Sequence, residues 1–196
     1  VIWCGGDVLT ESMVEQVDGI LAKYSKRPAK LMRGYGLTET CGVCVVNNYE
    51  HYAKNSCGHP IEGCRVEIWD DDGKPLAPNI TGEIVLTAKG LMSGYLGGGE
   101  DFVKDGKWIK TGDVGYVDEQ GFVYVVDRKK RMIKIAAVNV FPAEVEECIE
   151  RLPFVSEACV VGVKVDGKQY LKAFVSVKDR MPVNELSRLC TEHCKN

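Results

Sequence analysis

Two charged stretches in the second half of the chain carry residue types that bind sugars and phosphates. Lys110-Thr111-Gly112-Asp113 reads as a tight turn holding a carboxylate, and Asp127-Arg128-Lys129-Lys130-Arg131 follows as a compact basic cluster. A carboxylate in such a position can accept hydrogen bonds from a ribose diol. Arginine offers a planar fork of donors, and lysine supplies a mobile point charge. The structural alternative is that Asp113 caps a turn and the basic cluster is a solvated surface.

Composition and charge restrict the classes of protein to which the chain can belong. The chain has 196 residues and a formal net charge of −3, which argues against a nucleic-acid groove or an anionic membrane as partner. No apolar run is long enough to predict a transmembrane segment. Nine cysteines without regular spacing favour a reducing compartment, so we expect a cytoplasmic protein. Cys41 and Cys44 have zinc-like spacing, but no second close pair follows, so a metal site is not assigned here.

The elements that must position these residues change in character along the chain. Residues 1–4 and 31–33 are short β-type runs, and apolar residues at helical spacing predict an amphipathic helix over 11–24, capped by Thr10. We therefore expect an α/β segment over residues 1–57. Short strands separated by turn residues follow, and they predict a small, distorted antiparallel β-barrel over 58–126.

After residue 126 the pattern is that of a compact α+β unit. Pro142 suits the first position of a helix, and β-branched runs on either side of Asp166-Gly167 predict a hairpin. Asn184 is the expected cap of a last helix. The predicted fold is thus α/β plus α+β, with a boundary between residues 126 and 127.

Five motifs occur in one order that resembles the adenylate-forming superfamily of acyl-CoA synthetases, luciferases and peptide-synthetase adenylation domains. The resemblance covers nearly the whole chain. The motifs lie at residues 4–9, 34–40, 82–96, 110–113 and 127–146. The resemblance implies ATP-dependent activation of a carboxylic acid to an acyl-adenylate, followed by transfer to a thiol. The segment 139–146 is similar to that of acyl- or aryl-CoA ligases, so the implied cofactors are ATP/AMP, Mg²⁺ and coenzyme A.

The resemblance also implies roles for individual residues. Tyr35 matches an adenine-stacking aromatic, for which a core tyrosine is the structural alternative. Thr38 matches a phosphate-side hydroxyl, and Glu39 a carboxylate that holds Mg²⁺. Asp113 matches the ribose-binding acid. The complete implied set of nucleotide-binding residues is Gly5, Gly6, Tyr35, Gly36, Thr38, Asp113 and Arg128.

The remaining implied roles belong to a mobile C-terminal lid. Lys130 matches the hinge about which the lid turns between half-reactions, and a hinge residue need not take part in chemistry. Lys134 matches a lysine that acts in the second half-reaction of luciferases. Together with Thr38 and Glu39, it completes the set of catalytic candidates that the resemblance implies. Ala136 and Ala137 stand where the family has one or two glycines beside the path of the incoming thiol. Their methyl groups narrow that path and disfavour positive φ.

Two motifs of the family have no counterpart in this sequence. A phosphate-binding loop would lie upstream of Val1, and the lid lysine of the adenylation step would lie downstream of Asn196. We therefore interpret residues 1–126 as the C-terminal part of an adenylating domain and 127–196 as a hinge with a truncated lid. The remainder of the enzyme is then a required partner, and the chain alone is expected to be inactive. The alternatives are another branch of the superfamily and a non-catalytic nucleotide-binding module.

Overall fold

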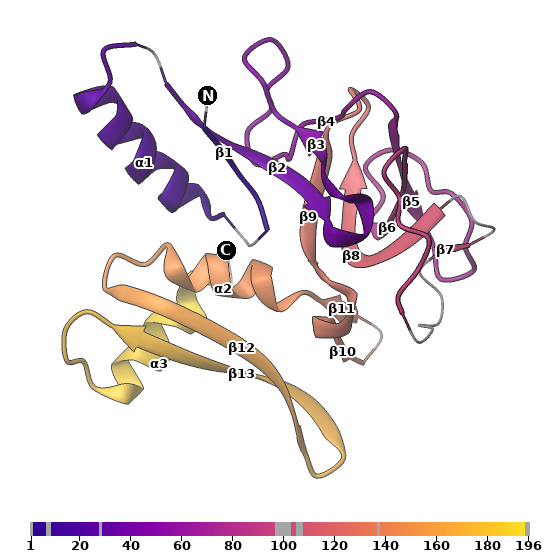
Figure 1. The fold of residues 1–196 in the computed structure, drawn as a ribbon. Helices are drawn as coiled ribbons and strands as arrows, with labels where there is room; N and C mark the ends of the chain where they lie inside the picture. The colour runs from indigo at the N-terminus through magenta and orange to yellow at the C-terminus, as the bar shows by residue number, and fades with distance from the viewer. Residues whose placement is uncertain are drawn as a thin grey trace. The chain divides into compact units, whose positions relative to one another are not determined.

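The computed structural model describes residues 2–6, 9–27, 29–96, 103–104, 108–136 and 138–194 (Figure 1). The chain divides into two compact units, Val1–Val125 and Val126–Asn196. Each unit is built around its own buried cluster. No helix in the described ranges is long and apolar enough to cross a bilayer.

The first unit opens with a four-stranded sheet of order β1-β2-β3-β4. Strands β1 and β2, which are connected by helix α1, pair in parallel. Strand β3 pairs with β2, and β4 pairs with β3, both in antiparallel orientation. The bounds are β1 (Ile2–Cys4), α1 (Glu11–Tyr24), β2 (Leu31–Leu37), the 3₁₀ turn η1 (Thr38–Thr40), β3 (Gly42–Val46) and β4 (His59–Pro60). Helix α1 begins as predicted, because the Thr10 side chain accepts a hydrogen bond from the backbone N–H of Met13.

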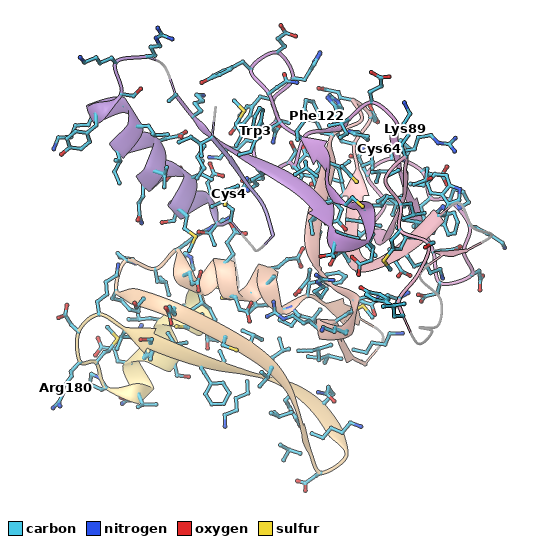
Figure 2. The ribbon with its side chains drawn as sticks, viewed as in Figure 1. Trp3, Cys4, Cys64, Lys89, Phe122 and Arg180 are labelled. Atoms are coloured by element: carbon cyan, nitrogen blue, oxygen red, sulfur yellow. The ribbon has the colours of Figure 1, made fainter. Side chains whose placement is uncertain are left out.

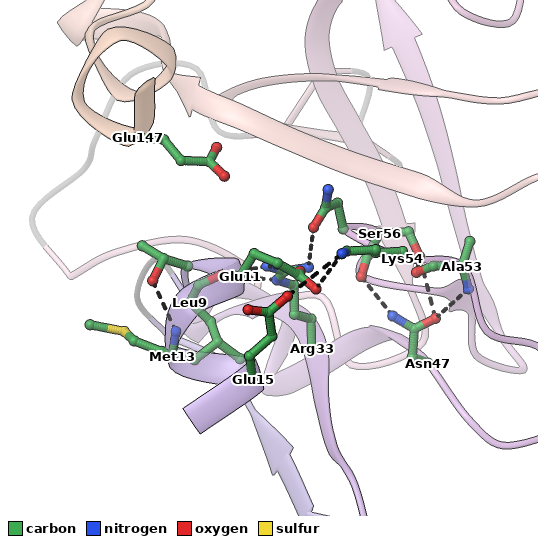
Figure 3. Close-up of polar contacts among 12 residues, drawn as sticks. Leu9, Glu11, Met13, Glu15, Arg33, Asn47, Ala53, Lys54, Ser56 and Glu147 are labelled. Atoms are coloured by element: carbon green, nitrogen blue, oxygen red, sulfur yellow. Dashed lines mark hydrogen bonds and ion pairs between the residues drawn. The ribbon is translucent and has the colours of Figure 1, made fainter. Parts of the chain in front are cut away.

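A polar network holds the start of this sheet in place (Figure 3). Arg33 on β2 donates from Nε and Nη2 to the carbonyl of Leu9, at 3.0 and 2.8 Å. Its Nη2 also lies 3.4 Å from Oε2 of Glu11 on α1. The buried Asn47, just after β3, donates from Nδ2 to the Ser56 carbonyl at 2.6 Å. The Arg33 bonds hold the segment before α1 to β2, the strand that carries Tyr35, and the Asn47 bond orders the loop between β3 and β4.

A second, antiparallel sheet completes the first unit and has the order β5-β6-β8-β7, with β9 also paired to β8. Its strands are β5 (Cys64–Trp69), β6 (Gly82–Ala88), β7 (Val103–Lys104), β8 (Trp108–Val117) and β9 (Val123–Arg128). The predicted antiparallel strands are present, but those that the structure describes do not close into a barrel. Phe122, labelled in Figure 2, stacks on His59 with ring centroids 4.1 Å apart.

The two sheets share one hydrophobic cluster. It is formed by Cys44, Val45, Cys57, Leu86, Ile109 and Val123, all of them buried. These residues come from the first sheet, from the second sheet and from the loop before β4, so burial of their apolar surface holds the sheets together. Tyr35 packs against the edge of this cluster.

The second unit is an α+β arrangement with two hairpins. Helix α2 (Pro142–Glu150) begins with Pro142, as predicted. The remaining elements are η2 (Lys129–Arg131), β10 (Ile133–Ile135), β11 (Val138–Val140), β12 (Val155–Val165), β13 (Lys168–Val177) and α3 (Val183–His193). Asp166 and Gly167 both have positive φ, at 49° and 76°, which is the two-residue hairpin geometry that the sequence predicts.

Three local expectations were wrong. Strand β2 continues through residues 34–37, beyond the predicted run over 31–33. The last helix is capped by Pro182 and not by Asn184, which lies inside its first turn. Asp113 lies within strand β8 and not in a turn between elements.

Candidate functional site

Asp113 projects from a bulge in β8. Glu83 of β6 faces Val114 and Val85 faces Lys110, so three residues of β8 oppose one of β6. Gly112 supplies the left-handed backbone that such an irregularity needs, with φ at 71°. The bulge explains why a Thr-Gly-Asp sequence with turn character lies inside a strand.

The carboxylate of Asp113 is buried and fixed in place, with only 4% of the residue exposed. The backbone N–H of Asp113 donates to Thr111 Oγ1 at 3.0 Å, and that hydroxyl donates to the Ile84 carbonyl at 2.8 Å. Thr111 is therefore a positioning residue that the sequence reasoning did not single out. The sign of this role in the sequence is the hydroxyl side chain two positions before Asp113.

Tyr35 and Asp113 meet although they are far apart in the sequence. Tyr35 Oη on β2 donates to Asp113 Oδ2 on β8 at 2.6 Å. A carboxylate can accept several hydrogen bonds at once. The pair therefore places an aromatic ring beside a carboxylate.

The glycines near Tyr35 have a packing reason for being glycine. A Cβ on Gly36 would lie 2.1 Å from the Gly42 carbonyl oxygen, and a Cβ on Gly5 would lie 2.8 Å from that of Gly34. Gly6 has φ at 97°, which disfavours any other residue. The fold alone thus accounts for these residues, and their contacts with a nucleotide stay a prediction.

Glu39 has a partner that the sequence reasoning missed. Tyr95 Oη lies 2.5 Å from Glu39 Oε1, and this hydrogen bond raises the pKa of Tyr95. The backbone N–H of Met92 donates to the Glu39 carbonyl at 2.8 Å. The neighbouring Thr38 is exposed on η1. The segment after β6 therefore orients the turn that carries both Thr38 and Glu39, and in the sequence it is part of the motif at residues 82–96.

The donor set at Glu39 fits a magnesium ion that is shared with phosphates. Glu39 offers a hard carboxylate oxygen, and Mg²⁺ is commonly bound by one or two carboxylates together with substrate phosphates and water. In the described ranges no three His, Cys, Asp or Glu residues gather closely enough to hold a metal ion by themselves. Glu39 would therefore be one ligand among several supplied by nucleotide and solvent.

The basic cluster of the second unit is organised by Asp127. This carboxylate is buried and accepts from the backbone N–H groups of Arg128 and Ala143, at 2.7 and 3.0 Å. Arg131 binds both carboxylate oxygens of Glu146, at 2.7 and 2.8 Å, and also lies 3.3 Å from Asp127. The network ties η2 to the start of α2. Arg131 is thus structural, which the sequence reasoning did not predict.

The other lid candidates lie on the surface of the second unit. Arg128, Lys130, Lys134 and Ala136 are all exposed. Ala136 occupies the turn between β10 and β11 with φ at 54°, although the sequence argument held that alanine disfavours this conformation. Two-residue hairpin turns need positive φ at their first position, so the turn geometry outweighs the preference of the residue. Ala137 lies outside the described residues.

Two protein-family profiles match this chain. The profile described as AMP-binding enzyme matches residues 1–96, and that of the AMP-binding enzyme C-terminal domain matches residues 144–196. The chain therefore belongs to the AMP-binding, adenylate-forming enzyme family, as its motifs predict.

Particular relatives are enzymes that join acids to thiols. The 2-succinylbenzoate–CoA ligase of Bacillus pumilus is 34% identical over 179 residues, covering 89% of this chain and 37% of that protein. A fatty acid–[acyl-carrier-protein] ligase of Streptomyces coeruleorubidus is 37% identical over 180 residues, covering 87% and 33%. The chain thus spans about a third of the length of these relatives.

A solved structure with bound nucleotide has the same fold. The o-succinylbenzoate coenzyme A synthetase of Bacillus subtilis, in complex with ATP and magnesium ion, matches 98% of this chain and 39% of its own. The TM-score is 0.82 at 30% sequence identity. This match confirms the predicted fold class.

Proposed function

We propose that this chain is part of an ATP-dependent acid–thiol ligase of the acyl- or aryl-CoA synthetase type. In the first half-reaction a carboxylate oxygen attacks the α-phosphorus of ATP, and pyrophosphate leaves. In the second, a thiol attacks the acyl carbon of the adenylate, loses its proton, and AMP leaves. The observation that carries the proposal is the hydrogen bond from Tyr35 to the buried Asp113, because it unites the adenine motif with the ribose motif.

The first unit would hold the nucleotide during adenylation. Asp113 accepts hydrogen bonds from the ribose hydroxyls, and the ring of Tyr35 stacks on adenine while its hydroxyl orients Asp113. Gly5, Gly6 and Gly36 keep the backbone close on either side of that site. Thr38 contacts the phosphates. Magnesium, when bound through Glu39, would neutralise charge on the phosphate oxygens.

The second unit would act as the lid in the second half-reaction. We assign residues 1–126 to the adenylating domain and 127–196 to the hinge and lid. Lys130 is the proposed hinge, Arg128 reaches the ribose, and Lys134 serves the thiol-transfer step. Ala136 and Ala137 border the path of the thiol.

Coenzyme A is the proposed acceptor. The pocket for the carboxylic acid should come mostly from the remainder of the enzyme. The names of the relatives include acceptors that are CoA and an acyl carrier protein. The nine free cysteines are compatible with a reducing compartment, and we include the cytoplasm in the proposal. The chain alone should not form acyl-adenylates, because it spans only about a third of the length of these ligases.

A double-mutant cycle in the enzyme that contains this chain tests the nucleotide assignment. Asp113→Asn should slow acid-dependent ATP–pyrophosphate exchange by at least about tenfold, since a hydrogen bond to a charged group contributes about 1.5–3 kcal/mol. Tyr35→Phe keeps the ring and removes only the hydroxyl, so its effect should be smaller and should not add to that of Asp113→Asn.

Tyr52→Phe is the matched control, because Tyr52 lies in the exposed loop between β3 and β4. It should leave exchange unchanged. If Asp113→Asn behaves like this control, or if the effects of Tyr35→Phe and Asp113→Asn simply add, the pair does not form one nucleotide site.

A further inference from the structure

The segment that follows strand β6 is held against the turn η1 by its backbone and by one apolar side chain. Leu91 packs against the buried cluster of the first unit, which anchors the segment. The backbone N–H of Met92 donates to the Glu39 carbonyl at 2.8 Å. Gly90 lies so close to η1 that a Cβ would be 3.1 Å from the Thr40 carbonyl oxygen. The segment is therefore fixed beside η1 before the chain reaches its tyrosine.

The turn η1 is also braced from within. Thr40 is buried, and its hydroxyl lies 2.9 Å from the carbonyl oxygens of both Leu37 and Gly42. The backbone N–H of Leu37 donates to the same hydroxyl at 3.1 Å. The backbone at Glu39 is thus held by Thr40 on one side and by Met92 on the other. The direction of the Glu39 carboxylate then depends on its own side-chain torsions.

The hydroxyl of Tyr95 determines where that carboxylate lies. Tyr95 Oη is 2.5 Å from Glu39 Oε1, and a distance of about 2.5–2.7 Å is typical of a charge-assisted hydrogen bond from a hydroxyl to a carboxylate. Because this bond raises the pKa of Tyr95, the phenol keeps its proton at neutral pH and remains the donor. An ionised carboxylate has further acceptor positions on both oxygens. The bond therefore orients Glu39 without neutralising it.

We propose that Tyr95 is a positioning residue that sets the affinity of the nucleotide site for Mg²⁺ by holding the carboxylate of Glu39. The inference rests on the proposed ligase function, in which Glu39 is a magnesium ligand. Mg²⁺ demands nearly octahedral geometry, so a carboxylate that is already oriented loses less side-chain freedom when the ion binds.

The size of the effect follows from the exposure of the pair. Loss of a group that hydrogen-bonds to a metal ligand typically lowers metal affinity about 10–100-fold. Tyr95 is 47% exposed, and solvent weakens charged contacts at exposed positions. We therefore expect a smaller loss on removal of the hydroxyl, of about three- to tenfold.

Binding of ATP to the enzyme that contains this chain, without the carboxylic acid, measures this effect apart from catalysis. Calorimetry gives the affinity for ATP with Mg²⁺ and with a chelator, and the ratio of the two reports the contribution of the metal. Tyr95→Phe keeps the ring and should lower this ratio about three- to tenfold, with the affinity for metal-free ATP unchanged. Glu39→Gln should lower the ratio at least as much, and Tyr95→Phe should have little further effect in that background. Tyr24→Phe is the matched control, because Tyr24 is an exposed tyrosine at the end of α1, and it should leave the ratio unchanged.

The other outcomes separate this inference from the proposed function. If Glu39→Gln lowers the ratio and Tyr95→Phe does not, the inference is wrong and the magnesium assignment of Glu39 stands. Equal weakening by Tyr95→Phe with and without Mg²⁺, or an undiminished effect in the Glu39→Gln background, also overturns it, because Tyr95 would then act elsewhere. If Glu39→Gln leaves the ratio unchanged, the magnesium role of Glu39 fails and the inference fails with it. Acid-dependent pyrophosphate exchange tests the ligase function separately in each case.

Discussion

Replacement of Ala136 by glycine should stabilise the second unit. Ala136 has φ at 54°, and a left-handed conformation costs an L-residue about 1–2 kcal/mol. Glycine removes that strain but loses about 0.5–1 kcal/mol through the greater freedom of the unfolded chain. The expected net gain is about 0.5–1 kcal/mol, or about 3–6 °C in the Tm of a unit of this size.

Thermal unfolding and hydrogen exchange of the β10 and β11 amides measure this effect. Ala173→Gly is the matched control, because Ala173 lies within strand β13 and is not among the residues with positive φ. The same chemical change should there be destabilising by about 0.5–1 kcal/mol. The reasoning is refuted if Ala136→Gly lowers the stability of the second unit as Ala173→Gly does.

The remaining predictions concern the segment that joins the two units. Burial, together with the nearby Asp127 carboxylate, raises the pKa of Glu144 in the folded state. Protonation of Glu144 therefore stabilises the fold; this stabilisation is complete below pH 4.5 and is lost as pH rises through the folded-state pKa. Glu144→Gln should therefore raise the Tm at pH 7 and not at pH 4, and an equal gain at both would contradict this. Arg131→Ala should destabilise the unit by about 1–3 kcal/mol in urea unfolding, because Asp127 and Glu146 lose their shared partner; no change in midpoint would mean that the network is dispensable. Brief trypsin treatment should cut first near the exposed Lys130 and release a fragment of about the size of residues 131–196; early cutting elsewhere would count against a hinge there.

Local patterns in the sequence were sufficient to predict several elements. The helix over 11–24 has a capping threonine and apolar residues at one spacing, and the Asp166-Gly167 turn supplies its own positive φ. Both depend on neighbours along the chain, so they can be read without knowledge of tertiary contacts. The start of α2 at Pro142 is a third example.

Contacts between distant segments could not be read in this way. Tyr35 and Asp113 are 78 positions apart, and nothing in either motif says that one hydroxyl binds the other carboxylate. The bulge at Gly112 depends on the register with β6, which local sequence does not specify. At Ala136 the local preference predicted the wrong conformation, because the hairpin imposes a positive φ that alanine disfavours.

The path of the carboxylate oxygen tests the central claim most directly. The enzyme that contains this chain is given ATP, CoA and an ¹⁸O-labelled carboxylic acid that supports pyrophosphate exchange, and the phosphate products are analysed by mass spectrometry. Attack of the acid on the α-phosphorus predicts one ¹⁸O atom in the phosphate of AMP, because the thiol later breaks the bond between the acyl carbon and that oxygen. Formation of ADP with ¹⁸O in inorganic phosphate, or of unlabelled AMP, would contradict the assignment of this chain to an adenylate-forming ligase.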